Sequence, residues 1–245
     1  MSPPDAHLRQ AFGRGDEENL RWQLEHPVVG ARERELVGAA FAPVGERLLD
    51  IGAGDGATLV HLGDPAGAVG LELFPDKLRL AKERLHRTAL IAGSAYALPF
   101  AAGSFDHVIV RDVVHHLDRP QSMLREAHRV LAPGGRFDLL EPCRYNPLIV
   151  FHALSQKVER GELKSTAPYL RGLIEAAGIE IDHEQHYQPL PLHRLVFHRR
   201  FGVPTLGGSA MVRAAVEAAE QLAERFVPRF AWAYIHLRAT KPGHG

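Results

Sequence analysis

Apolar and polar residues follow one another along this chain in blocks that predict alternating strands and helices from about residue 45 onward. Short runs of Leu, Ile and Val are typical of buried strands, whereas apolar residues three or four apart indicate helices packed on one face. The pattern predicts strands at 47–51, 68–73, 89–92, 106–110 and 136–140, with helices at 57–62, 75–86 and 120–131 between them. Alternation of this kind predicts an α/β fold, a parallel sheet covered by helices on both faces.

The pattern is looser on both sides of this region. Helices are predicted at 16–26 and 29–41, with a break at Pro27, and further helices at 147–160, 168–177 and 209–227. Strands are predicted at 179–187 and 232–240. The segment 188–208 is rich in Pro and Gly, which favours an insertion over a core element. We therefore expect a helical cap (1–44), a core (45–187), a helical insertion or lid (188–230), and a final strand with a tail (231–245).

Composition narrows the classes of function. The chain has 245 residues, with 29 Lys and Arg against 29 Asp and Glu, and this balance argues against a dedicated nucleic-acid-binding protein. Its single cysteine excludes an internal disulfide framework. Neither a secretory signal nor a membrane-spanning run is evident. We expect a soluble cytoplasmic protein that acts on a small molecule; its oligomeric state is not predicted.

A glycine-rich turn directly after the first core strand is the strongest chemical signal. Gly52, Gly54 and Gly56 let the backbone approach a ligand closely, because no Cβ intervenes. Ala57 completes a G-x-G-x-x-A pattern, and Glu72 follows about 20 positions after Gly52, as in dinucleotide-binding sites. From these residues alone, a nicotinamide dinucleotide and S-adenosylmethionine (SAM) are both open.

Further motifs distinguish the two cofactors. They are Gly93-Ser94-Ala95-Tyr96-Ala97-Leu98-Pro99-Phe100, Gly103-Ser104-Phe105-Asp106-His107-Val108-Ile109-Val110, His115-His116-Leu117, Leu124-Arg125-Glu126 and Arg129-Val130-Leu131-Ala132-Pro133-Gly134-Gly135. In their order and spacing the chain resembles the class I SAM-dependent methyltransferases, over residues 45–142. The likeness is greatest to the type 11 small-molecule group, which includes ubiquinone and menaquinone pathway methyltransferases.

This resemblance implies both a fold and a reaction. The fold would be a Rossmann-like, doubly wound, mostly parallel sheet of seven strands, the last one antiparallel, with helices on both faces and a helical cap. The reaction would transfer methyl from SAM to an oxygen, nitrogen or carbon nucleophile of a small molecule and leave S-adenosylhomocysteine. The resemblance says little about which molecule accepts the methyl group.

The resemblance also implies which residues bind the cofactor. They are Asp50, Gly52, Ala53, Gly54, Glu72, Leu73, Ser94, Ala95 and Arg111. Asp50 would accept from the ammonium group, Glu72 would hold the ribose hydroxyls, and Leu73 would pack on the adenine. Ser94 stands where the family usually has an acidic residue, and a neutral hydroxyl binds less strongly than a carboxylate. At Arg111 the family uses a backbone carbonyl.

His115 and His116 are the candidates for catalysis. A histidine suits proton removal if the acceptor is a hydroxyl or an amine. Neighbouring residues on a helix face different ways, so at most one is expected to point at the reacting centre. The alternative is a hydrogen-bonded structural pair. No metal site is predicted, because the chain has no H-E-x-x-H motif and no paired cysteines.

Other interpretations stay open at this point. The chain could be an NAD-dependent oxidoreductase, or a non-catalytic SAM-binding protein, to which the departure at Ser94 gives some weight. Arg111 could pair with Asp112 or Glu141, and Glu141 could either be buried and paired or face the acceptor.

Overall fold

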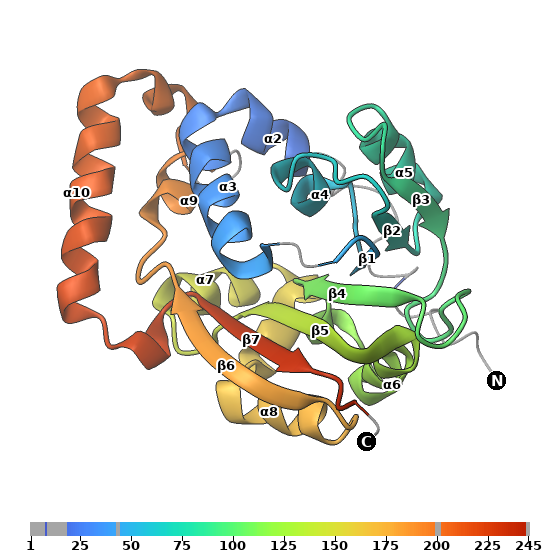
Figure 1. The fold of residues 1–245 in the computed structure, drawn as a ribbon. Helices are drawn as coiled ribbons and strands as arrows, with labels where there is room; N and C mark the ends of the chain where they lie inside the picture. Colours follow the sequence, from blue (N-terminus) through green and yellow to red (C-terminus); the bar gives the residue numbers. More distant parts are fainter. Residues whose placement is uncertain (1–7, 9–18, 43–44, 199–201, 244–245) are drawn as a thin grey trace.

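A seven-stranded sheet forms the centre of the protein, and helices cover both of its faces (Figure 1). The computed structural model describes residues 8, 19–42, 45–198 and 202–243. The strands are β1 (Leu48–Ile51), β2 (Val69–Glu72), β3 (Ala89–Ala92), β4 (Phe105–Arg111), β5 (Leu131–Pro142), β6 (Glu180–Tyr187) and β7 (Tyr234–Thr240). Their order in the sheet is β3-β2-β1-β4-β5-β7-β6, and β7 runs antiparallel to both neighbours. This arrangement confirms the predicted fold.

The helices vary in length and type. The α-helices are α2 (Asn19–Glu25), α3 (Pro27–Phe41), α4 (Ala57–His61), α5 (Pro75–Lys82), α6 (Pro120–Val130), α7 (Pro147–Ser155), α8 (Ala167–Glu175), α9 (Leu192–Val196) and α10 (Ala210–Phe226). The short 3-10 helices are η1 (Val114–His116), η2 (Lys157–Lys164), η3 (Pro204–Gly208) and η4 (Arg229–Ala231).

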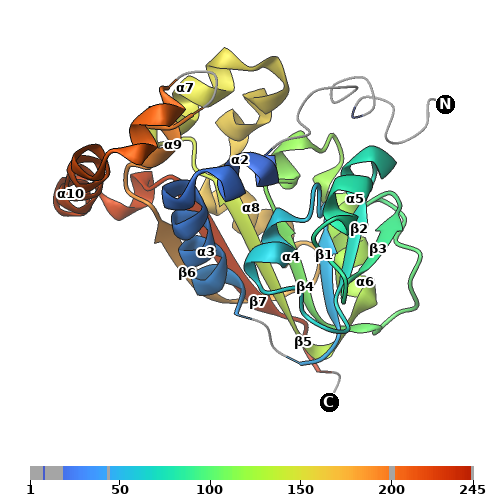
Figure 2. The same ribbon diagram turned by 90° about the horizontal axis from the view of Figure 1, so that it is seen from above.

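Side-chain alternation along the strands divides the core into two layers. In β4, Val108 and Val110 pack in the cluster that contains α6 and α8, whereas Ile109 packs in the cluster that contains α3, α4 and α5. Successive side chains of a strand point to opposite faces, so each buried strand supplies both layers. The two groups of helices lie on opposite sides of the sheet in both views (Figures 1 and 2). The carboxyl ends of β1, β2 and β4 are left open between these layers.

Several predicted bounds of helices and strands were wrong. Helix α5 ends at Lys82 rather than near residue 86, because Asp64 accepts the backbone N–H groups of His86, Arg87 and Thr88 and so fixes them outside the helix.

Other corrections concern the ends of neighbouring elements. The break between α2 and α3 falls at His26, and α3 begins at Pro27 rather than at residue 29, since a proline at the first position needs no N–H donor. Residues 132–135 belong to β5, which starts at Leu131 and has an irregular register opposite Phe105 and His107. Helix α7 ends at Ser155, and η2 follows it as a separate element. Residues 16–18 of the first predicted helix lie outside the described residues.

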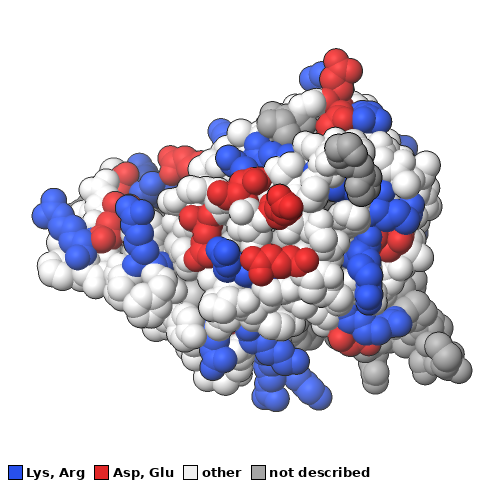
Figure 3. All heavy atoms as spheres, turned by 60° about the horizontal axis from the view of Figure 1, so that its bottom comes forward, with Lys and Arg blue, Asp and Glu red and all other residues white. Residues whose placement is uncertain are grey.

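The segment predicted as an insertion is partly buried. Phe197, just after α9, is fully buried against Trp22 of α2, whose indole N–H donates to the Phe197 carbonyl oxygen. Helix α10 lies at the side of the molecule beside α9 (Figures 1 and 2). Within the described ranges, no helix has the length and apolar character needed to cross a membrane. On the face drawn in Figure 3, acidic and basic side chains are both present and neither sign covers the face.

Candidate active site

The glycine turn joins β1 to α4 at the open edge of the sheet. Gly52 has a φ of 80°, and a Cβ on it would lie 2.4 Å from Cγ2 of Val113. Gly54 has a φ of 58°, and a Cβ there would meet nothing within 4 Å. Only glycine takes this left-handed backbone without strain. The turn therefore packs tightly at Gly52 against Val113, the residue before η1, and faces open space at Gly54.

Glu72, the last residue of β2, supports the turn from the neighbouring strand. Its carboxylate accepts the N–H groups of Gly54 at 2.9 Å and Phe74 at 3.0 Å. Each carboxylate oxygen still has a lone pair for another donor. Glu72 thus fixes the turn and remains able to accept from two hydroxyl groups of a ligand.

A cleft at this edge brings most of the predicted residues together. Its lining includes Gly52, Gly54, Glu72, Leu73, Ala95 and His116. The cavity measures about 140 Å³, and Leu8 forms part of its wall. Sites for drug-sized ligands commonly measure about 300 Å³ or more, so this cleft is small for such a ligand.

Asp50 and Arg111 lie close to the cleft but do not line it. Alternation along β1 and β4 directs both side chains to the α3 face of the sheet. The carboxylate of Asp50 is buried, and among the described residues its Oδ2 atom has no hydrogen-bond partner. Burial raises the pKa of Asp50 to about 7, and the charge of Glu72 acts in the same direction. An orphaned buried oxygen of this kind fits a site that receives a polar ligand.

The Arg111 guanidinium binds other protein groups. It donates to Glu33 of α3 at 2.5 Å and pairs with Asp112 at 3.3 Å, not with Glu141. Glu33 also pairs with Arg194 of α9. Burial would raise the pKa of Glu33, but Arg194 and Arg111 lower it to about 2. This buried network, which we call the Glu33 latch, connects α3, β4 and α9.

Ala53 and Ser94 also lie outside the lining of the cleft. Ala53 is buried in the layer that contains α3, α4 and α5. The Ser94 hydroxyl accepts the N–H of Tyr96 at 3.1 Å and so supports the turn after β3. These two residues shape the backbone beside the cleft.

The paired histidines lie in η1, and their surroundings differ. His115 is enclosed: its Nδ1 contacts Glu141 at 2.7 Å and its Nε2 contacts Glu159 at 3.3 Å. Glu141 is buried and also accepts the N–H groups of Val113 and Val114. Burial alone would lower the pKa of His115, but the carboxylates of Glu141 and Glu159 raise it well above its usual value.

His116 lines the cleft. Its Nε2 lies 3.8 Å from Glu159, and its side chain is 17% exposed. Burial lowers the pKa of His116 to about 4, and the neighbouring His115 acts in the same direction. Of the two histidines, His116 is therefore the one placed to meet a ligand, whereas His115 is fixed between two carboxylates.

Several residues of the site were not found from the sequence. Lys77, Asp112 and Val113 also line the cleft, and Glu159 reaches the histidines from 44 residues beyond His115. No metal site was predicted, yet His115, His116 and Glu159 lie close enough together to be considered as ligands of one ion. Nothing in the local pattern around Glu159 identifies it, because its partner histidines lie in another element.

A second cavity lies away from the strand ends. It measures about 570 Å³ and lies between α3, residues 187–193 and α10. None of the predicted cofactor residues lines it, and its walls carry ion-paired side chains such as Arg32 and Glu220. Despite its larger volume, we place the chemistry in the cleft, where the glycine turn and the open strand ends meet.

Known proteins identify the family. A family model described as a methyltransferase domain matches residues 49–139. An uncharacterised methyltransferase of Synechocystis sp. is 32% identical over 172 residues, which are 65% of this chain and 80% of that protein. The chain belongs to the SAM-dependent methyltransferases. Its cofactor is accordingly SAM rather than a nicotinamide dinucleotide.

Two other proteins show how far the likeness extends. The demethylmenaquinone methyltransferase of Renibacterium salmoninarum is 36% identical over 109 residues, which are 44% of this methyltransferase and 46% of that protein. The chain thus spans about half the length of that relative. The structure of a SAM-dependent methyltransferase from Thermotoga maritima superposes with a TM-score of 0.65 and 22% identity, covering 96% of this chain and 98% of the other. That second likeness concerns the fold.

Proposed function

We propose that this methyltransferase acts on a small molecule, which it binds beside His116 and methylates at an oxygen, nitrogen or carbon atom. The acceptor atom forms a bond to the methyl group of SAM as the carbon–sulfur bond breaks. The sulfur keeps that electron pair and leaves in S-adenosylhomocysteine, and the oxygen, nitrogen or carbon acceptor gives up a proton to solvent. The observation that carries this proposal is that the glycine turn, Glu72 and His116 line one cleft. A nucleophile in that cleft needs chiefly in-line positioning.

Each predicted cofactor residue has a proposed part. Glu72 accepts from both ribose hydroxyls, because its oxygens keep free lone pairs beside the turn. Asp50 provides its unsatisfied oxygen to the ammonium group, directly or through water. Leu73 and Ala95 give apolar contacts to the adenine. The remaining residues act through their backbone: Gly52, Ala53, Gly54, Ser94 and Arg111.

On the acceptor side we propose unequal parts for the two histidines. His116 contacts the acceptor, since it lines the cleft. His115 is a positioning residue, because Glu141 and Glu159 occupy both of its ring nitrogens. We propose that α2, α3 and residues 188–230 form the cap that excludes water from the cleft. The Glu33 latch supports this division, since it fastens α3 and α9 to the end of β4.

The small size of the acceptor is supported from outside the site. The Renibacterium relative is named for demethylmenaquinone, which is a small molecule. The net charge of the whole chain is balanced, whereas a protein that acts on a polyanion such as a nucleic acid usually carries an excess of basic residues.

Calorimetric titration with SAM tests the proposal. Glu72→Gln keeps the shape of the side chain but removes its charge, so we expect SAM affinity to fall about 10- to 100-fold. Glu83→Gln is the matched control, because Glu83 follows α5 and is exposed. We expect this substitution to leave the SAM affinity unchanged. Mass spectrometry of a panel of hydroxyl, amine and carbon acceptors then detects methyl transfer. Equal SAM affinity in both variants, or binding of NADH in place of SAM, would overturn the proposal.

A further inference from the structure

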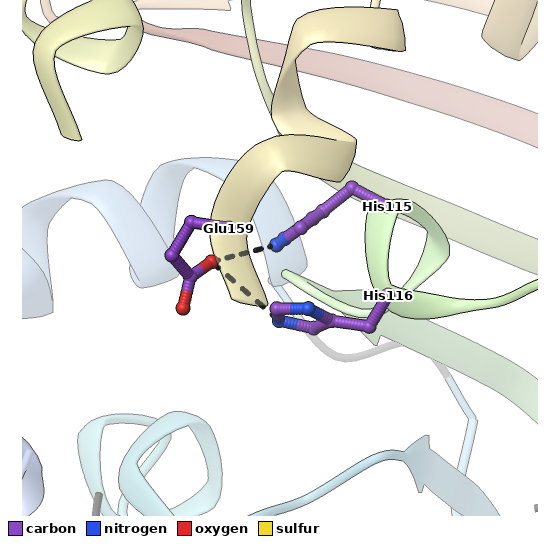
Figure 4. A group of neighbouring side chains, drawn as sticks. All are labelled: His115, His116 and Glu159. Atoms are coloured by element: carbon purple, nitrogen blue, oxygen red, sulfur yellow. Dashed lines mark hydrogen bonds and ion pairs between the residues drawn. The ribbon is translucent and has the colours of Figure 1, made fainter. Parts of the chain in front are cut away.

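Three potential metal-binding side chains converge where η1 meets η2. His115 and His116 extend from η1, and Glu159 reaches them from η2 (Figure 4). Glu159 Oε2 lies 3.3 Å from Nε2 of His115 and 3.8 Å from Nε2 of His116. The ligand atoms of the three all lie within 4.8 Å of one another. Ligand atoms about 2.0–2.2 Å from one tetrahedral ion lie about 3.3–3.6 Å apart, so small side-chain rotations would bring these three atoms to bonding distance of a shared ion.

The position of Gly161 brings the two elements together. A Cβ on Gly161 would lie 1.7 Å from the carbonyl oxygen of His115, so only a glycine permits this approach of η2 to η1. The contact places the carboxylate of Glu159, two residues earlier, beside the Nε2 atoms of both imidazole rings (Figure 4). The meeting of the three side chains is therefore built into the backbone.

The orientation of His115 matches that of a metal ligand. Its Nδ1 is bonded to Glu141 at 2.7 Å, which directs Nε2 toward Glu159. Glu141 is itself fixed by the backbone N–H groups of Val113 and Val114. Histidines that bind metals commonly donate their other ring N–H to a carboxylate in this way, and that partner fixes the ring before the ion binds.

The local charge favours a cation. Glu141, Glu159 and Glu162 lie close together, and within the described part of the chain all of their ion pairs are with histidine. A divalent ion that binds the imidazoles displaces any proton from their metal-binding nitrogens and supplies two positive charges to the same three carboxylates. Glu159 is 13% exposed, so an ion can reach the cluster without unfolding of the chain.

We propose that His115, His116 and Glu159 bind one divalent transition-metal ion, such as Zn²⁺, on the acceptor side of the cofactor cleft. Two imidazoles and one carboxylate suit such ions and leave a coordination position open. Because His116 also lines the cleft, an acceptor bound there would lie near the open position of the ion. This inference about the acceptor rests on the proposed function. The acceptor is a molecule with a hydroxyl or enol oxygen, and its O–H group becomes more acidic when the oxygen binds the ion.

Metal titration of the full chain, stripped with a chelator and free of SAM and acceptor, tests the site itself. We expect one equivalent of Co²⁺ to bind, with the visible absorption of a site of low coordination number, and Zn²⁺ to displace it. Glu159→Gln and His116→Gln each weaken binding at least about 10-fold, as loss of even an outer-sphere partner does. His183 is an exposed histidine of β6, and His183→Gln serves as the control that leaves Co²⁺ binding unchanged.

Two further measurements keep the test decisive. We expect Zn²⁺ to raise the melting temperature of the unaltered chain but not that of Glu159→Gln. Circular dichroism checks that the variant is folded. Failure of Co²⁺ to bind saturably, or equal affinity in Glu159→Gln and the unaltered chain, overturns the site. SAM calorimetry on the same samples separates the two proposals. A chain that binds SAM but does not bind Co²⁺ contradicts only the metal site. A chain that binds Co²⁺ but does not bind SAM contradicts only the proposed function.

The acceptor class has its own test. We expect removal of the ion to lower the turnover of hydroxyl acceptors at least about 10-fold and to leave the turnover of amine acceptors unchanged. The reason is that the ion makes a hydroxyl group more acidic, whereas an amine chiefly binds such an ion without losing a proton. Equal turnover of both classes with and without Zn²⁺ overturns the acceptor class.

Discussion

The cofactor side of the cleft and the proposed cap beside it are held together by different interactions. On the cofactor side, backbone groups dominate: the N–H of Gly52 donates to the Leu71 carbonyl, and the N–H of Gly54 donates to Glu72, 18 residues away. On the cap side, charged side chains dominate. Glu33 binds Arg111 across 78 residues and Arg194 across 161 residues. The two sides therefore depend on different parts of the sequence.

This difference shows what each side tolerates. A backbone turn with positive φ angles has one steric requirement at each position, which a single added Cβ violates. A buried charge network has a stoichiometric requirement instead, since removing one partner leaves another charge buried without compensation. Substitutions that test the two requirements separately should give effects of different kind and size.

The largest expected effect is on the Glu33 latch. Glu33→Gln leaves Arg111 buried without a counter-charge on α3, and we expect a loss of about 3–5 kcal/mol in the free energy of unfolding. Urea denaturation at pH 7 measures it. Glu35→Gln, on the same helix with a side chain that is 65% exposed, changes the stability by less than about 0.5 kcal/mol. Similar losses in the two variants would contradict the latch.

The same carboxylate predicts a pH dependence. Its pKa is about 2 in the folded chain against a usual value of 4.5, so its contribution is fully present above about pH 5 and is lost as pH falls toward 2. The stability difference between the unaltered chain and Glu33→Gln should shrink over that range in urea titrations at stepwise lower pH. A difference that stays constant from pH 7 to pH 3 would contradict this prediction.

The next effect is on the glycine turn. Gly52→Ala combines a left-handed alanine with a clash against Val113, and we expect it to cost about 2–4 kcal/mol of stability. Gly54→Ala has no such clash and should cost about 1–2 kcal/mol, but its methyl group enters the cleft and weakens SAM binding. Thermal melts and SAM calorimetry on both variants test this. Equal stability of the two would show that the contact with Val113 is unimportant.

The smallest expected effect on SAM binding lies between η1 and η2. Gly161→Ala would place a Cβ 1.7 Å from the His115 carbonyl oxygen and so push η2 away from η1. We expect it to cost about 3 kcal/mol of stability or more, with SAM affinity unchanged because the glycine turn is not involved.

A glycine in α8 provides the control for this substitution. Gly172→Ala meets nothing within 4 Å and should stabilise the chain by about 0.5–1 kcal/mol. Melting curves and SAM titration compare the two variants. A large loss of SAM affinity in Gly161→Ala would show that the two sides of the cleft are coupled.

Sequence patterns predicted the strands well where a short apolar run is buried on both faces, as in β1 and at the centre of β4. They failed at element ends such as Lys82, where the boundary depends on Asp64, a residue of a distant loop. At the site, the residues of the turn and Glu72 follow from the motif. The side-chain direction of Arg111 does not, because it depends on which helix covers that face of the sheet.

The sequence by itself determined the order of strands and helices, the glycine turn after β1 and the family of the chain, because these depend on residues near one another or on motifs in fixed order. Only the tertiary structure decided that Glu33 joins Arg111 to Arg194, and that Glu159 lies beside the ring nitrogens of His115 and His116. Such contacts join residues that are dozens to more than a hundred positions apart. Their partners are chosen by how the elements pack, and no local pattern of apolar and polar positions records that choice.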